Sequence, residues 1–170
     1  MSVNVRVLQC RPEAVFRVLA NGWLYPSWVV GATRMRDVDV SWPEPGSQLR
    51  HSLGVWPALI NDETHAIEWN PPHRMRIRPT GWPLGEALVT IDVKARASGC
   101  VVRIQEEAVA GPVRWIPRPL IDILLWWRNT ETLHRLAYLA EGIPEDAPAP
   151  TTAEREASGD LAVGSRGMVA

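Results

Sequence analysis

The chain has 170 residues, of which 46% are hydrophobic and 22% are charged, and its formal net charge is −1. This composition is typical of one globular domain, and the nearly balanced charge argues against nucleic acid as a main partner, because phosphate binding requires a basic excess. The longest apolar run, residues 123–127, is far shorter than the roughly 20 residues of a membrane span, so we expect no membrane span.

The start of the chain and its cysteines bear on location and cofactors. Residues 1–16 lack a basic segment followed by an apolar one, the pattern of a secretion signal, so we expect a cytoplasmic protein. Cys10 and Cys100 are too few for a disulfide scaffold and lack zinc spacing, which predicts reduced thiols. We find no glycine-rich phosphate loop and no metal-ligand spacing, so neither a cofactor nor a metal ion is expected.

The first part of the chain alternates short regular elements with turns. Apolar and polar residues alternate over residues 3–8, which predicts a half-buried strand. Pro12 suits the first turn of a helix, and Asn21-Gly22 suits its end. The predicted elements are a strand at 3–8, a helix at 11–22, a short turn or helix at 23–30, a strand at 33–40 and a loop at 41–47.

Strand patterns dominate the middle of the chain. Residues 74–78 show the pattern most clearly, with Met75 and Ile77 on one face and three arginines on the other. Turns rich in proline, glycine and asparagine separate the candidates. The predicted strands are 48–55, 59–69, 74–78, 87–94 and 101–107.

One long helix, at residues 119–142, follows the strands. At ~1.5 Å per residue this helix is roughly 35 Å long, about the diameter of a domain of this size. Its apolar face needs a partner, and the only large partner available is the sheet, so we predict an α+β fold. A sheet that wraps around one such helix can enclose a cavity.

The composition changes after residue 142. Residues 143–170 contain three prolines, many small residues and no aromatic residue. Such a segment buries too little apolar surface to offset its ordering entropy. We therefore predict a folded domain at 1–142 and a disordered tail at 143–170.

Five segments of the chain carry a family resemblance: RPEAVFRVLANGWLYPSWVVGATRMRDVD, WPEPGSQLRHSLG, NPPHRMRIR, IQEEAVAGP and RNTETLHRLAYLAEG. Over residues 1–142 the chain resembles the START-like or Bet v 1-like (SRPBCC) superfamily, in particular bacterial polyketide cyclase/dehydrase-like proteins. The resemblance implies a helix-grip fold, in which a curved antiparallel sheet of about seven strands wraps around a long C-terminal helix, with two short helices after the first strand. It also implies a cavity for lipids, polyketides or other apolar or aromatic molecules. The five segments are packing and turn patterns and contain no catalytic signature.

Two titratable residues are placed on apolar strand faces by alternation. Glu106 shares a face with Val102 and Ile104, where partial desolvation would suit a general acid or base. The alternatives are that the strand ends there and Glu106 reaches solvent, or that it pairs with an arginine. His51 shares a face with Leu49 and is either a ligand-binding or proton-shuttling group or a hydrogen-bonded core histidine.

The last helix has an inner stripe that changes character along its length. Steps of 100° per residue place Leu133 on an apolar stripe that continues back to Asn129, Trp126 and Asp122. Buried polar residues need partners, so Asp122 and Asn129 either line a solvated cavity mouth or cap neighbouring loops. We predict ligand-binding roles for Asp122, Trp126, Asn129 and Leu133.

The first two turns of this helix are apolar nearly all round, whereas a sheet covers only one side. A patch at Leu120, Leu124 and Trp127 therefore predicts self-association as a homodimer or contact with a membrane surface. The alternative is that residues 23–30 and 111–118 cover the patch.

These patterns leave three hypotheses for the function. The first is binding of a small hydrophobic or aromatic molecule, without catalysis. The second is a cyclase or dehydratase in which Glu106 or His51 moves a proton next to a ligand carbonyl. The third is an interaction protein that acts through the apolar start of the last helix.

Overall fold

The structure is a computed structural model that describes residues 2–55, 58–80, 85–109 and 118–144. It contains one antiparallel sheet, three α-helices and one short 3-10 helix within these ranges. In chain order the elements are β1 (Ser2–Leu8), α1 (Pro12–Ala20), η1 (Gly22–Leu24), α2 (Tyr25–Trp28), β2 (Ala32–Val38), β3 (Gln48–Val55), β4 (Ala58–Asn70), β5 (Arg74–Pro79), β6 (Ala87–Arg96), β7 (Gly99–Ala108) and α3 (Arg118–Glu141).

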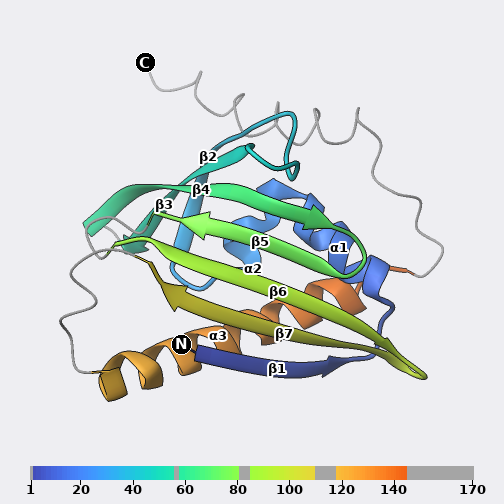
Figure 1. Ribbon diagram of the computed structural model, residues 1–170. Coiled ribbons are helices and arrows are strands. Elements are labelled where there is room, and N and C mark those ends of the chain that lie inside the picture. The colour runs from blue at the N-terminus through green and yellow to red at the C-terminus, as the bar shows by residue number, and fades with distance from the viewer. Residues whose placement is uncertain (1, 56–57, 81–84, 110–117, 145–170) are drawn as a thin grey trace.

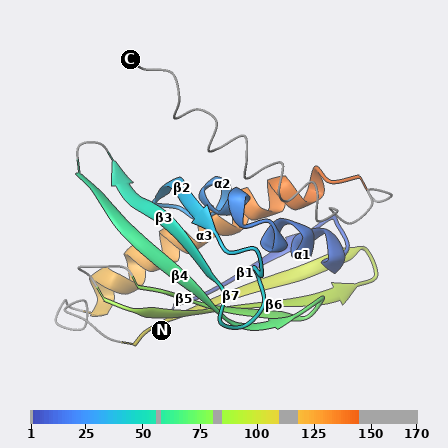
Figure 2. The ribbon, with the colours of Figure 1, turned by 90° about the horizontal axis from the view of Figure 1, so that it is seen from above.

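The seven strands lie in the order β1-β7-β6-β5-β4-β3-β2. Consecutive strands from β2 to β7 are neighbours, and β1 pairs with β7, with Ser2 opposite Glu106 and Leu8 opposite Cys100. The three helices lie on one side of the sheet, and the β2–β4 end of the sheet bends toward them (Figures 1 and 2). This arrangement confirms the predicted α+β helix-grip fold.

The core lies in the layer between the sheet and the helices. From α3 it takes the predicted inner stripe, because Leu133, Leu136 and Ala137 are each at most 2% exposed. Phe16 of α1 packs on Trp69 of β4, with ring centroids 5.1 Å apart. The helical and strand periodicities of the sequence therefore assign these inner faces correctly.

Strand β1 buries its polar face. The outer face carries Val3, Val5 and Val7, which are 40%, 60% and 48% exposed, whereas Ser2 and Asn4 are buried. The predicted half-buried strand is confirmed, and its buried face is the one that carries Ser2 and Asn4. Asn4 tolerates burial because its Nδ2 donates hydrogen bonds to the carbonyl oxygen of Trp126 and to Thr130 Oγ1 on α3.

The two cysteines lie side by side where β1 ends and β7 begins. Both are free thiols, and their side chains are within hydrogen-bonding contact. Burial, together with the neighbouring Cys100, raises the pKa of the Cys10 thiol to about 12. The two cysteines are therefore free thiols, as predicted, and the structure places them beside each other.

Two further predictions concern the tail and the absence of a membrane span. Of the tail predicted at 143–170, residues 145–170 lie outside the described residues, so the boundary at 142 stays a prediction. No helix in the described ranges is long and apolar enough to cross a membrane.

Candidate functional site

Glu106 lies on the inner face of β7, as strand alternation predicts, and is 4% exposed. Its Oε2 accepts hydrogen bonds from Arg128 Nη2 and, at 3.0 Å, from Asn129 Nδ2, both on α3. The buried carboxylate is therefore balanced by a cation and an amide that belong to the helix. Of the alternatives for Glu106, pairing with an arginine is the one observed.

Arg128 joins the sheet to the helix. Besides Glu106, its Nη2 also reaches Asn129 Oδ1, at 3.3 Å. The Arg128 side chain is 35% exposed and that of Glu106 is 5% exposed. The ion pair therefore has one solvent-accessible member and one buried member, which places it at the border of the layer between sheet and helix.

His51, on β3, belongs to a second group of buried polar side chains. It is 1% exposed, its Nε2 lies 3.0 Å from Thr64 Oγ1, and its ring packs 4.9 Å from that of Tyr25. The Tyr25 hydroxyl also contacts Thr64 Oγ1, at 3.1 Å. Burial lowers the pKa of His51, and the charge of Arg36 lowers it further, while Asp62 opposes them. The imidazole is therefore held neutral near pH 7.

Asp62 stands directly opposite His51 in the pairing of β3 with β4. It is 2% exposed and accepts a hydrogen bond from the Thr80 hydroxyl. Its Oδ2 lies 3.8 Å from His51 Nε2. This part of the inner sheet face therefore holds a carboxylate, an imidazole and two hydroxyl groups in place of apolar packing.

The Tyr25 hydroxyl connects the two polar groups electrostatically. Burial raises the pKa of Tyr25 to about 12, and the charges of Asp62 and Glu106 add to the increase. The hydrogen bond with Thr64 and the charge of Arg128 lower this pKa. Charges from both groups thus act on one buried hydroxyl. We refer to Tyr25, His51, Asp62, Thr64, Glu106, Arg128 and Asn129 as the inner polar cluster.

The predicted stripe of α3 is only partly buried. Asn129 and Leu133 are each 2% exposed, but Trp126 is 58% exposed, so the stripe does not continue through its indole. The carbonyl oxygen of Trp126 is the acceptor for Asn4, so the helix backbone is what β1 contacts there. The side chain of Asp122 lies outside the described residues, and its role stays a prediction.

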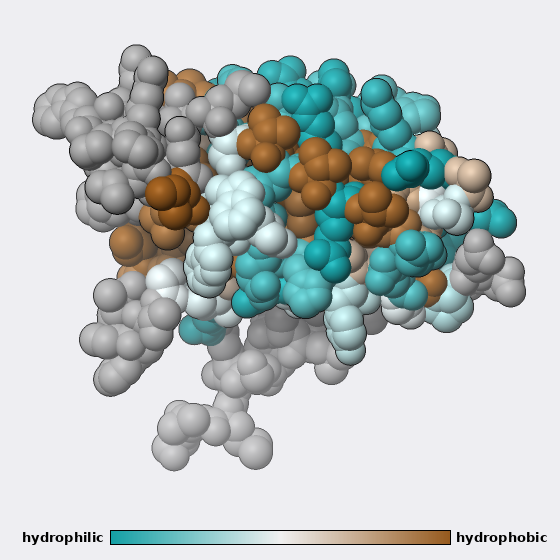
Figure 3. Space-filling model, turned by 90° about the horizontal axis from the view of Figure 1, so that it is seen from below, coloured by the Kyte–Doolittle hydropathy of each residue, from teal (hydrophilic) through white to brown (hydrophobic). Residues whose placement is uncertain are grey.

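The start of α3 presents a large apolar surface. Ile123, Leu124, Trp126 and Trp127 are 66%, 62%, 58% and 59% exposed. Seen from below, apolar side chains gather on the face of the molecule that carries β1 and α3 (Figure 3). Residues 23–30 therefore do not cover these four side chains. Leu120 and residues 111–117 lie outside the described side chains.

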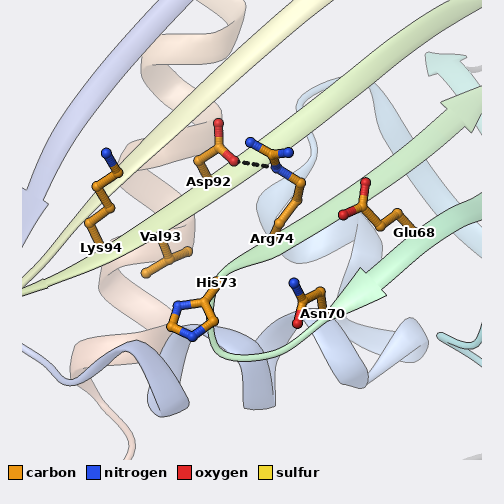
Figure 4. Close-up of a pocket in the computed structure, with 7 residues that line it drawn as sticks. All are labelled: Glu68, Asn70, His73, Arg74, Asp92, Val93 and Lys94. Atoms are coloured by element: carbon orange, nitrogen blue, oxygen red, sulfur yellow. Dashed lines mark hydrogen bonds and ion pairs between the residues drawn. The ribbon is translucent and has the colours of Figure 1, made fainter.

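A pocket of about 210 Å³ opens on the outer face of the sheet, which faces away from the helices, beside the turn between β4 and β5. In Figure 4 the guanidinium of Arg74 points toward Asp92, and the two are 2.6 Å apart. Glu68 pairs with Arg76 at 3.7 Å. The pocket is lined by Glu68, Asn70, His73, Arg74, Asp92, Val93 and Lys94. Arg74 and Asp92 therefore pair within the pocket, and Glu68 pairs with Arg76, which does not line it.

Metal-binding groupings are absent from the described residues, where no three His, Cys, Asp or Glu side chains gather in a way that could hold an ion.

Periodicity in the sequence places His51, Glu106, Asn129 and Leu133 on inner faces, where the structure buries them, but it does not single out Tyr25, Asp62, Thr64 and Arg128. Asp62 and Thr64 share the inward parity of Ala66 on β4, so strand alternation offered a signal for them. Arg128 gave no local signal, because its partner lies on a strand whose position depends on the whole fold.

Comparison with known proteins identifies the family and supports the fold. Residues 2–141 match the model of a family described as polyketide cyclase / dehydrase and lipid transport. No curated protein matches the chain.

Solved structures share the fold at low sequence identity. A protein from Chromobacterium violaceum is 19% identical, with a TM-score of 0.66, 83% of this chain covered and 97% of that one. The di-domain ARO/CYC StfQ from the steffimycin biosynthetic pathway is 10% identical, with a TM-score of 0.64, 82% of this chain covered and 49% of that one. Ara h 8.0201 is 8% identical, with a TM-score of 0.58, 81% of this chain covered and 95% of that one.

Proposed function

The chain belongs to the polyketide cyclase / dehydrase and lipid transport family, and we propose that it binds a small hydrophobic or aromatic molecule, lipid-like or polyketide-like, in a cavity between the sheet and α3. The bound molecule would lie against Leu133 and Asn129 of α3 on one side and against His51 and Glu106 on the other.

The observation that carries this proposal is the second nitrogen of the His51 ring. His51 Nδ1 is buried and has no hydrogen-bond partner among the described residues. A buried polar atom left in that state costs roughly 1–3 kcal/mol. A ligand oxygen or N–H at this position would supply the missing partner, on the inner face of the sheet, where the cavity is proposed.

An enzyme of the cyclase or dehydratase type has less support. Such an enzyme needs Glu106 and His51 to converge on one reacting atom. Glu106 is engaged by Arg128 and Asn129, whereas His51 contacts Thr64 and lies near Asp62. Each titratable group therefore has its own partners. The binding function requires only an apolar volume with a few polar groups.

A second candidate function is self-association, because the start of α3 is exposed. We propose a homodimer through Leu120, Leu124 and Trp127. The exposure of Leu124 and Trp127, 62% and 59%, favours it, since an apolar cluster of this kind on a monomer often marks an interface. Analytical ultracentrifugation of Leu124→Ser/Trp127→Ser should then give a monomer where the wild type gives a dimer. The matched control is Tyr138→Ser, which alters a 79% exposed residue near the other end of the helix. A monomeric wild type that does not bind vesicles would exclude both the dimer and a membrane-surface role.

The binding function is tested on protein purified from a cytoplasmic extract of its own host, which also tests the predicted location. We expect native mass spectrometry to detect a small molecule that co-purifies. We also expect N-phenyl-1-naphthylamine, a neutral aromatic probe, to bind saturably and to shift the ¹⁵N resonances of the His51 imidazole. The exposed His73 ring is the internal control, and its resonances should not move. Absence of both a co-purified molecule and saturable probe binding would contradict the proposal.

A further inference from the structure

The guanidinium of Arg128 lies in the layer where the proposed ligand would enter. Arg128 extends from α3, and its Nη2 reaches Glu106 on the inner face of β7. The charge of Arg128 also acts on the buried hydroxyl of Tyr25. The head of this side chain is therefore directed into the space between helix and sheet.

Only some of the N–H donors of Arg128 have hydrogen-bond partners among the described residues. A guanidinium has five N–H groups, and the two on Nη2 suffice for the bonds to Glu106 Oε2 and Asn129 Oδ1. The donors on Nε and Nη1 have no partner among the described residues. The Arg128 side chain is 35% exposed, so part of it is open to a molecule that arrives from solvent.

Glu106 and Asn129 act as positioning residues for this arginine. Both are buried, at 4% and 2% exposed, and Asn129 Nδ2 in turn fixes the carboxylate at 3.0 Å. Arginine side chains lose considerable rotamer freedom when they are fixed. Here the protein has already ordered the guanidinium, so a ligand group that accepts from it meets a pre-organised donor.

We propose that Arg128 binds the acidic head group of the ligand, so that the ligand is an amphiphilic acid with an apolar or aromatic body and one anionic group at its end. This assignment deepens the proposed binding function and rests on it. The body lies against the apolar stripe of α3 around Leu133, and the head remains near the solvent-accessible end of the layer, at Arg128.

The ion pair with Glu106 does not remove the preference of Arg128 for an anionic ligand group. Arginine stays protonated at any physiological pH, and its N–H groups form stronger hydrogen bonds to anions than to neutral acceptors. Glu106 is bonded to Nη2, so among the described residues Nε and Nη1 are left for a second acceptor. A neutral ligand would gain less from the same donors, which gives the site a preference for acids.

Two probes with the same aromatic body, one neutral and one anionic, show how much the charge of a ligand contributes to binding. N-phenyl-1-naphthylamine is neutral, and 8-anilinonaphthalene-1-sulfonate adds one sulfonate to the same ring system. Fluorescence titrations of both against the full chain give a selectivity ratio, the neutral probe's Kd divided by the sulfonate probe's Kd. This ratio measures the contribution of the anionic group.

The informative variant is Glu106→Gln/Arg128→Gln, which removes both charges and leaves no buried carboxylate without a cation. We expect its selectivity ratio to fall about tenfold, in line with the loss of a charged hydrogen bond. Glu106→Gln alone keeps Arg128 and removes the competing carboxylate, so its ratio should equal or exceed the wild-type value. Arg135→Gln makes the same change of residue on an exposed part of α3, where Arg135 pairs with Glu131 at 2.8 Å, and should leave the ratio unchanged.

Leu124→Ser/Trp127→Ser controls for adsorption of the probes to the apolar start of α3. This variant should bind both probes as the wild type does, and a loss of the sulfonate probe there would overturn the assignment. An unchanged ratio in Glu106→Gln/Arg128→Gln, with both probes still bound, would overturn the role of Arg128 and leave the binding function intact. If neither probe binds the wild type, the binding function fails, and the assignment of Arg128 fails with it.

Discussion

Asn4 Nδ2 donates a hydrogen bond to the carbonyl oxygen of Trp126 over 2.9 Å, so a side chain of the first strand holds the backbone of the last helix. The same amide donates to Thr130 Oγ1, at 2.8 Å, and Ser2 Oγ donates to Asn4 Oδ1, at 3.1 Å. The contact between β1 and this part of α3 is therefore polar and directional.

Asn4→Leu should destabilise the chain although leucine is more apolar. The substitution removes three hydrogen bonds, two that Asn4 donates to α3 and one that it accepts from buried Ser2. Their loss costs about 1–2 kcal/mol in free energy of unfolding. Urea denaturation followed by circular dichroism measures this difference, with Val5→Leu on the exposed face of β1 as the control. Equal stability of Asn4→Leu and wild type would show that the polar contact is dispensable.

Replacing only Arg128 should lower the free energy of unfolding more than replacing both Glu106 and Arg128. Arg128→Gln leaves a buried carboxylate without its cation, and we expect a loss of about 2 kcal/mol, less than for a fully buried pair because Arg128 is partly exposed. Glu106→Gln/Arg128→Gln should recover at least half of that loss. A double-mutant cycle by chemical denaturation gives the coupling. Additive single-variant effects would mean that the two side chains do not interact in solution.

Stability should fall as the pH drops below about 6.5, partly through His51. The pKa of His51 is lowered in the folded chain by burial, so the unfolded chain takes up a proton that the folded chain does not. The stabilisation is present above the unfolded pKa of about 6.5 and is lost toward lower pH, at up to ~1.4 kcal/mol per pH unit. His51→Gln lacks this group, so its stability between pH 7 and 5.5 should fall less than that of the wild type. Parallel pH profiles for the two proteins would contradict the burial of a neutral imidazole.

Tyr25 should ionise only near pH 12. The chain has two tyrosines, so Tyr138→Phe leaves Tyr25 as the only phenol, and its absorbance near 295 nm should titrate with a pKa of about 12. In denaturant the same variant should titrate near 10, the value for an exposed tyrosine. A native midpoint equal to the denatured one would place the Tyr25 hydroxyl in solvent.

Cys10 should react slowly with alkylating agents in the folded protein. With its pKa raised to about 12, the thiolate fraction at pH 8 is on the order of 10⁻⁴, and the thiolate is the reactive form. Mass spectrometry after brief iodoacetamide treatment at pH 8 should show an unmodified native chain and two modified cysteines in denaturant. A native Cys10–Cys100 disulfide in the untreated protein would contradict the assignment of two free thiols.

The sequence allows the inward faces of several elements to be predicted because their periodicity is local. The two-residue repeat places His51 and Glu106 inward, and the 3.6-residue repeat places Leu133 inward. In β1 the repeat marks two faces without saying which is buried. That choice depends on α3, which supplies the partners for Asn4.

The remainder of the site depends on contacts between distant parts of the chain. Arg128 meets Glu106 only when α3 lies across β7, and no repeat within either element shows this. Trp126 departs from the predicted stripe because an angular count assumes that one face of a helix is buried along its whole length. The start of α3 instead leaves its large apolar side chains exposed.

The pairing of β1 with β7 has a consequence for synthesis on the ribosome. Ser2 finds its partner Glu106 only after more than a hundred further residues have been made, because the two positions are adjacent in the sheet. Until then β1 has two open edges, and Val3, Val5 and Val7 give it an apolar face as well. The nascent first strand thus lacks its partner strand, and stays open to aggregation or to a chaperone, until β7 emerges from the exit tunnel.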